Sequence, residues 1–132
     1  MQTRDQKYAF SAFERVSIIS KKEKQFYETY GAMAHKLPIL IRKAGLAQAL
    51  SFVEAKAKDK AAYSSLLTDL KATVGRNENL AALARSVELT DYILLTKQIM
   101  DALLWYKRFA QSVLGIDATT ATMADPEGGK ES

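Results

Sequence analysis

The chain has 132 residues, of which 48% are hydrophobic and 26% charged, a size that fits a single domain with one core. The absence of cysteine excludes disulfides, thiolate nucleophiles and zinc–sulfur sites. No uninterrupted apolar run approaches the roughly 20 residues that cross a bilayer, and the first residues, MQTRDQKYAF, lack the apolar region of a secretory signal. We therefore expect a soluble, cytoplasmic protein with no membrane role.

The formal net charge of +4 is distributed unevenly along the chain. Residues 116–132 contain four acidic residues and one lysine, so residues 1–115 carry a formal charge of +7. We expect a helical bundle domain over 1–115 and an acidic, flexible C-terminal tail over 116–132, because the tail's small and polar residues cannot bury enough surface to fold alone. The basic domain favours polyanionic partners, although lysine-rich surfaces also serve solubility.

The first two predicted elements are helices marked by capping boxes. Thr3 and Gln6 form the first box, and the apolar residues behind it recur at helical spacing as far as Ile19. A second box begins at Ser20, so we expect the first helix to end near Ile19 and the second helix to begin at Lys21.

Proline and glycine divide the middle of the chain. Pro38 lies inside the second helix, where it removes a backbone donor and is expected to kink or break the helix near Lys36. Gly45 is expected to end that helix, and a short third helix runs from there into the lysine-rich stretch AKAKDK. Asp59 is the predicted cap of a fourth helix, which ends at Gly75.

Two more helices complete the prediction. Asn77 or Asn79 caps a brief fifth helix, and Ser86 opens a long last helix that ends at Gly115. No segment alternates like a strand, and no Asn-Gly or Asp-Gly hairpin turn occurs. The sequence therefore predicts an all-α fold, a compact single-domain bundle of five to six helices in which the C-terminal helix, 87–114, is central.

The last helix carries more apolar surface than one neighbouring layer can cover. Its segment ILLTKQIMDALLWYKRF is apolar on almost every side, whereas an amphipathic surface helix shows one apolar stripe. Ile93, Met100 and Leu104 lie outside the main apolar seam, so we expect them to face a partner. Trp105 and Tyr106 are candidates for a base-stacking platform, but aromatic residues at helical spacing more often belong to a core.

The sequence offers little for catalysis. The sole histidine, His35, has no metal-ligand spacing around it, and such a residue is more often at the surface or its boundary than catalytic. No phosphate-binding, dinucleotide-binding or zinc-protease motif occurs. We expect no catalytic residue, no metal, no cofactor, no small-molecule substrate and no enzymatic activity.

Basic residues remain as the candidate binding groups. One set forms a stripe on the first helix, expected opposite the face that carries Tyr8, and two pairs lie near later helix ends. An alternative interpretation is a solvated face with cations near helix C-termini, which the helix dipole favours by about 0.3–1 kcal/mol each. Taken together in a basic domain, they are equally consistent with a phosphate-binding surface. The candidates are Arg4, Lys7, Arg15, Arg42, Lys43, Lys107 and Arg108.

Three blocks of sequence carry a resemblance to a known family. They are T-R-x-Q-x-x-A at 3–9, K-L-P-x-L-I-x-x-x-G-L-x-Q-A-L-x-F at 36–52, and L-T-x-x-x-x-x-A-L-x-W-x-K-R-F-A at 95–110. In order and spacing the chain resembles the small all-helical subunit, the fifth Cmr subunit family, of the type III-B CRISPR effector known as the Cmr complex.

The resemblance implies a role in an RNA-guided antiviral complex. It implies a non-catalytic subunit that stacks in the minor filament beside copies of itself, the backbone subunits and the large subunit, and helps hold target RNA along the crRNA duplex. RNA-facing positions carried over from the blocks are Arg4, Arg42, Lys43, Lys107 and Arg108, while Lys7 and Arg15 rest on the helical stripe. The alternative is a helical protein–protein interaction module with no nucleic-acid role.

Overall fold

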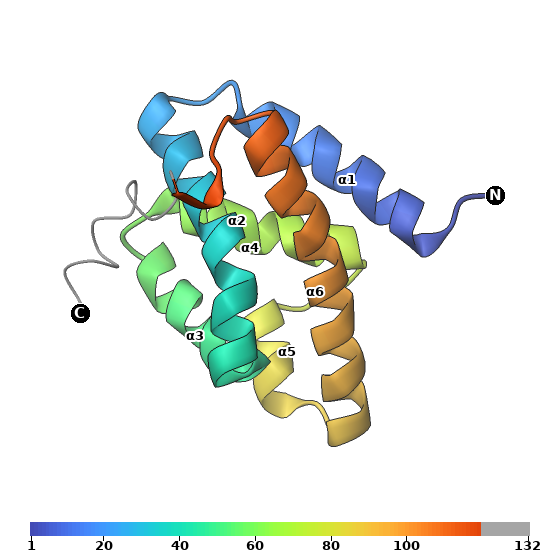
Figure 1. The fold of residues 1–132 in the computed structure, drawn as a ribbon. Coiled ribbons are helices and arrows are strands. Elements are labelled where there is room, and N and C mark those ends of the chain that lie inside the picture. The colour runs from blue at the N-terminus through green and yellow to red at the C-terminus, as the bar shows by residue number, and fades with distance from the viewer. Residues whose placement is uncertain (120–132) are drawn as a thin grey trace.

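The structure is a computed structural model that describes residues 1–119. Within this range the regular secondary structure is helical, and Figure 1 shows α1 lying across one end of a bundle in which α2 and α6 run side by side. The helices are α1 (Arg4–Ile19), α2 (Lys24–Ala44), α3 (Leu46–Ala57), α4 (Ala61–Val74), α5 (Leu80–Ser86) and α6 (Leu89–Ser112). The predicted all-α bundle is confirmed.

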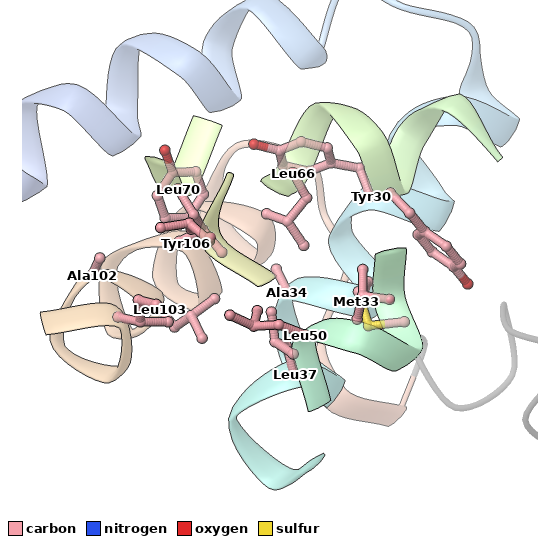
Figure 2. Packing of buried hydrophobic residues seen from close by; sticks show 14 of the residues in the cluster. Tyr30, Met33, Ala34, Leu37, Leu50, Leu66, Leu70, Ala102, Leu103 and Tyr106 are labelled. Carbon is pink, nitrogen blue, oxygen red and sulfur yellow. The ribbon is translucent and has the colours of Figure 1, made fainter. Parts of the chain in front are cut away.

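The long last helix holds the bundle together. Helix α6 packs against α1, α2 and α4, and α2 also contacts α3 and α4. Two of its side chains, Leu103 and Tyr106, are inaccessible to solvent, and they point into the same apolar core as Leu37, Leu50 and Leu70 (Figure 2). The predicted central position of this helix is confirmed, but its apolar side chains Ile93, Leu94 and Leu104 remain exposed.

The first helix has the predicted cap, but the second does not. Thr3 Oγ1 accepts from the backbone N–H of Gln6, whose side chain accepts from the backbone N–H of Thr3. The box predicted at Ser20 is wrong: its hydroxyl donates to the carbonyl of Ser17 in the preceding helix, at 2.6 Å. Helix α2 therefore begins three residues later than predicted, at Lys24.

Pro38 does not break α2, which runs without interruption from Lys24 to Ala44. A proline in a helix leaves the carbonyl four residues before it without its usual partner. Pro38 is buried, and α2 packs against α3, α4 and α6 along its length. We attribute the continuity of the helix to this packing on several sides.

Gly45 and Gly75 end α2 and α4 as predicted, but α6 ends at Ser112, before the predicted Gly115, and two helix starts were also predicted wrongly. Gly75 ends α4 in the left-handed conformation, with φ of 76°, and Asn79 caps α5. Asp59 is not a cap, because α4 begins after Lys60 without a side-chain cap. Ser86, expected to open the last helix, is instead the final residue of α5.

The end of the bundle lies beyond the predicted boundary at residue 115. Ile116 is buried, and a Cβ atom at Gly31 of α2 would meet its side chain at 3.1 Å, so the glycine makes room for it. His35 Nε2 lies 2.6 Å from the Ile116 carbonyl oxygen, and the histidine is buried rather than at the surface. Ile116, predicted to belong to the acidic tail over 116–132, thus packs into the bundle, and residues 120–132 lie outside the described part of the chain.

Two neighbouring leucines of α6 provide a test of the core. Leu103 is inaccessible and Leu104 is 54% exposed. We predict that Leu103→Ala lowers the free energy of unfolding by about 2–5 kcal/mol because it leaves a cavity. The matched change Leu104→Ala is expected to cost less than about 0.5 kcal/mol. Urea unfolding measures both, and equal losses would contradict this packing.

Candidate nucleic-acid interface and partner surface

Arg4 connects the start of α1 to α6. Its guanidinium forms an ion pair with Asp101 and lies over the Tyr8 ring, 5.2 Å from the ring centroid. Lys97 reaches the same carboxylate at 3.4 Å. The stripe of basic residues was predicted opposite the Tyr8 face, and for Arg4 this is wrong, because its side chain lies at the edge of that face and contacts a neighbouring helix.

Arg15 also points toward a neighbouring helix rather than away from the bundle. One guanidinium nitrogen lies 3.4 Å from Oδ1 of Asp69 on α4, and Nε donates to Ser11 Oγ at 3.4 Å. The other carboxylate oxygen of Asp69 accepts from the Tyr30 hydroxyl of α2 at 2.6 Å. The predicted placement opposite the apolar face is therefore wrong for Arg15 as well.

Two hydroxyl contacts extend these polar interactions to α6. Ser11 Oγ lies 2.7 Å from Thr73 Oγ1, which lies 2.7 Å from the Tyr106 hydroxyl. Side chains of α1, α2, α4 and α6 thus share a polar network in and beside the apolar core. The network comprises Ser11, Arg15, Tyr30, Asp69, Thr73 and Tyr106.

Burial determines the ionisation of this polar network. It raises the pKa of Asp69, and the hydrogen bond from Tyr30 and the charge of Arg15 act in the opposite direction. Burial also raises the pKa of Tyr30 and that of Tyr106, so both phenols stay protonated and able to donate. The pKa of Asp69 is raised overall because desolvation of the carboxyl group outweighs the donors that favour its charged form.

Three of the predicted cations remain directed to solvent. Lys7, Arg42 and Lys43 are exposed, and within residues 1–119 their side chains form no ion pair or hydrogen bond. Arg42 and Lys43 occupy the last turn of α2, where the helix dipole favours cations. They are accessible for contacts with an anionic ligand.

The pair near the end of α6 lies beside a cluster of aromatic rings. The Arg108 guanidinium lies 5.6 Å from the centroid of Trp105, which stacks on Phe109 at 5.8 Å. Phe109 in turn meets Phe13 of α1 edge to face at 5.4 Å. Lys107 is half-buried and Arg108 is exposed. Tyr106 is inaccessible and belongs to the core, so only Trp105 of the two proposed stacking residues reaches the surface.

The seven predicted cations do not form one patch. The Tyr92 hydroxyl of α6 accepts from the backbone N–H of Ala47, so the end of α2 lies beside the start of α6. Lys107 follows Tyr92 by about four turns, which places it roughly 22 Å further along the helix axis. The structure thus separates Arg42 and Lys43 from Lys107 and Arg108, and it engages Arg4 and Arg15 in internal ion pairs.

The predicted partner residues differ in their exposure. Ile93 is 61% and Leu104 is 54% exposed, whereas Met100 is half-buried and packs against the core. Further large apolar side chains on α6 and α1 are exposed. They are Leu89 and Leu94 of α6 and Phe10, Phe13 and Ile18 of α1.

The described residues offer no site for a metal ion. Among residues 1–119, no three or more His, Asp or Glu side chains gather in a group that could hold one. In the same range His35 Nδ1 is the one buried side-chain nitrogen or oxygen without a hydrogen-bond partner. None of the helices described here is long and apolar enough to cross a membrane.

Comparison with known proteins gives consistent matches over most of the chain. Residues 4–113 match a family model described as "CRISPR-associated protein (Cas_Cmr5)". A curated protein of Thermus thermophilus, "CRISPR system Cmr subunit Cmr5", is 41% identical over 116 residues, which is 86% of this chain and 98% of that protein. The crystal structure of a CRISPR-associated Cmr5 family protein from Thermus thermophilus is similar at a TM-score of 0.78 and 41% identity, covering 86% of this chain and 99% of that one.

The Tyr30–Asp69 hydrogen bond provides a test with a defined dependence on pH. We predict that Tyr30→Phe lowers the free energy of unfolding by about 1–3 kcal/mol near neutral pH, because it removes a donor from a partly buried carboxylate. The pKa of Asp69 is raised in the folded chain, so its contribution to stability is present below the unfolded pKa, about 3.9, and is lost as pH rises through the folded value.

Tyr30→Phe raises the pKa of Asp69 further, because the hydrogen bond that it removes lowers this pKa. Its cost, measured by urea unfolding, is therefore expected to be larger near pH 7 than near pH 4. In an Asp69→Asn background this difference between the two pH values should vanish. A cost that is independent of pH in the parent chain would show that the hydroxyl does not stabilise the carboxylate.

Proposed function

Because the chain belongs to the CRISPR-associated Cmr5 family, we propose that it is a non-catalytic subunit of a type III-B Cmr complex in antiviral defence. Its relative from Thermus thermophilus is a Cmr subunit and matches almost over its full length. The absence of a catalytic motif in the sequence agrees with a structural role. Other subunits of the complex would then supply the chemistry.

We propose further that the subunit helps hold target RNA along the crRNA duplex. The observation that supports this best is the pair Arg42 and Lys43, two adjacent exposed cations with no internal partner among the described residues. Ammonium and guanidinium groups on phosphates carry affinity without reading the base sequence, which suits a complex whose specificity lies in base pairing. Lys7, Lys107 and Arg108 are further candidates on other parts of the surface.

Stacking in a filament is the third part of the proposal. A head-to-tail arrangement needs two different surfaces on each copy, because a two-fold contact uses the same surface twice. Exposed apolar side chains on α6, Ile93 and Leu104, and on α1, Phe10, provide two candidate surfaces. Copies of this chain, the backbone subunits and the large subunit are the proposed partners.

One observation favours the alternative, a helical interaction module with no nucleic-acid role. Arg4 and Arg15, two of the seven candidate cations, are engaged by Asp101 and Asp69, so they already serve to hold helices together. Under this alternative the remaining cations serve solubility alone. Binding to RNA distinguishes the two functions.

The RNA-binding proposal predicts a specific effect when two charges are reversed. In a reconstituted complex, Arg42→Glu/Lys43→Glu is expected to reduce retention of target RNA and to lower the log–log salt slope by about 0.7 for each phosphate that is no longer neutralised. The control, Lys56→Glu/Lys58→Glu, reverses the same number of charges at the C-terminal end of α3. An equal reduction from both pairs would indicate general electrostatic attraction and no defined contact.

The stacking proposal predicts that a polar residue on α6 impairs assembly. Ile93→Gln is expected to leave folding unchanged, because the side chain is 61% exposed, and to reduce incorporation of the subunit into a reconstituted complex. Ile39→Gln, an equivalent change at a 46% exposed position of α2, is the control. Co-purification with the other subunits measures both. Normal incorporation of the Ile93 variant would remove this surface from the proposal.

A further inference from the structure

A polar groove lies between α1 and α4. The two helices run antiparallel: Ser11, in the middle of α1, contacts Thr73 near the end of α4, and Arg15, one turn later in α1, contacts Asp69, one turn earlier in α4. Beyond these contacts the helices leave a groove of about 260 Å³, bounded by the last turn of α1, Lys22 and the first turns of α4.

The walls of this α1–α4 groove are rich in hydrogen-bond donors. Arg15 lies on one wall with 38% of its side chain exposed, and its single contact with Asp69, at 3.4 Å, leaves other N–H groups available. Lys22 is exposed, with its ammonium 5.7 Å from the Phe26 ring centroid. The opposite wall carries three hydroxyl groups on one face of α4, from Ser64, Ser65 and Thr68.

The charge in the groove favours an anion. Asp69 is the one acidic residue among the groove's lining residues, and both of its carboxylate oxygens already accept from Tyr30 and Arg15. Two cations, Arg15 and Lys22, therefore face a groove with one engaged carboxylate. Arg15 lies in α1 and Lys22 lies seven residues later, in the turn that follows this helix.

We propose that the α1–α4 groove binds a backbone phosphate of single-stranded RNA. This inference rests on the proposed RNA-binding function and adds a site to it, with Lys22 and the α4 hydroxyls as contacts. Cations together with serine and threonine hydroxyls are the groups that contact phosphates in protein–nucleic-acid complexes. A tetrahedral phosphate accepts from donors on both walls at once, which a planar carboxylate with two oxygens does less well.

An exposed apolar side chain beside the groove is consistent with a nucleotide as the ligand. Ile18 lines the groove and is 59% exposed, so a ribose or base attached to the bound phosphate has an apolar surface to cover. Arg15 gains a second role in this arrangement, since the guanidinium that orders α1 on α4 also faces the ligand. Its loose contact with Asp69 leaves it able to bind a phosphate without leaving the carboxylate.

Two adjacent lysines allow a matched experiment on the full chain. Lys21 and Lys22 are both exposed, but only Lys22 lines the groove. Binding of a fluorescein-labelled oligo-uridine is followed by fluorescence anisotropy over a series of salt concentrations. We expect Lys22→Glu to weaken binding roughly three- to tenfold and to lower the log–log salt slope by about 0.7, with a clearly smaller effect of Lys21→Glu.

A neutral variant tests the hydroxyl wall separately. Ser64→Ala/Thr68→Ala changes two exposed side chains and no charge, and it is expected to weaken binding about two- to fivefold while leaving the salt slope unchanged. Circular dichroism and thermal unfolding confirm that each variant is folded. An unchanged affinity in this variant would overturn the assignment of the hydroxyls.

The outcomes separate the groove from the wider proposal. If Lys21→Glu and Lys22→Glu weaken binding equally, or if only Arg42→Glu/Lys43→Glu does so, the groove is not a phosphate site, while RNA binding stands. If the parent chain does not bind the RNA at all, the groove site is overturned, while retention of target RNA by the reconstituted complex tests the RNA-binding function separately. Poly-glutamate is added as a competitor at equal charge concentration. If it displaces the RNA, and if this displacement requires Lys22, the groove recognises carboxylates, which also overturns the inference.

Discussion

Four helices of the bundle meet at a network of hydrogen bonds that begins at the Tyr106 hydroxyl and ends at the Tyr30 hydroxyl. Between them lie Thr73, Ser11, Arg15 and Asp69, each held by a neighbour on a different helix or turn. Apolar packing alone tolerates small rotations and slides of one helix against another, whereas a satisfied buried polar network stabilises one arrangement. The network therefore fixes the register of α1 on α4, and with it every surface that these two helices form together.

This register explains why the cationic residues of α1 have two different roles. Arg4 and Arg15 lie at the edges of the buried face, where each reaches an acidic side chain on a neighbouring helix, while Lys7 is directed to solvent. An arginine suits the edge position because its long stem packs against apolar surface and its guanidinium has several donors. The cations of α1 that hold the bundle together and those available to a ligand thus lie on different sides of the helix.

The sequence predicted those parts of the fold and of the candidate site that depend on local patterns. The Asn79 cap joins groups three residues apart, whereas Ser20 carried a similar signal and yet bonds to the preceding helix, because a hydroxyl can reach either side. Helical periodicity gives the buried face of a helix but not the neighbour that covers each edge, so the partner of Arg15 could not be predicted. Ile116 was assigned to the tail by its polar and acidic surroundings in sequence. In the structure it fills the space that the missing side chain of Gly31 leaves, a contact between residues far apart in the chain.

A rigid bundle has a consequence for binding that a flexible chain of the same charge would lack. The accessible cations lie on separate parts of the surface, and few phosphates can contact one copy at once, so the affinity of one subunit for RNA is expected to be low. Because α1, α2, α4 and α6 are fixed relative to one another, the positions of these cations are fixed as well. In the proposed filament each copy would then present its cations at a constant spacing, and weak contacts repeated along one RNA would act as linked sites, whose combined affinity exceeds that of any single contact. Such an arrangement depends on geometry more than on charge, since linked sites contribute only when all of them can engage the same ligand together.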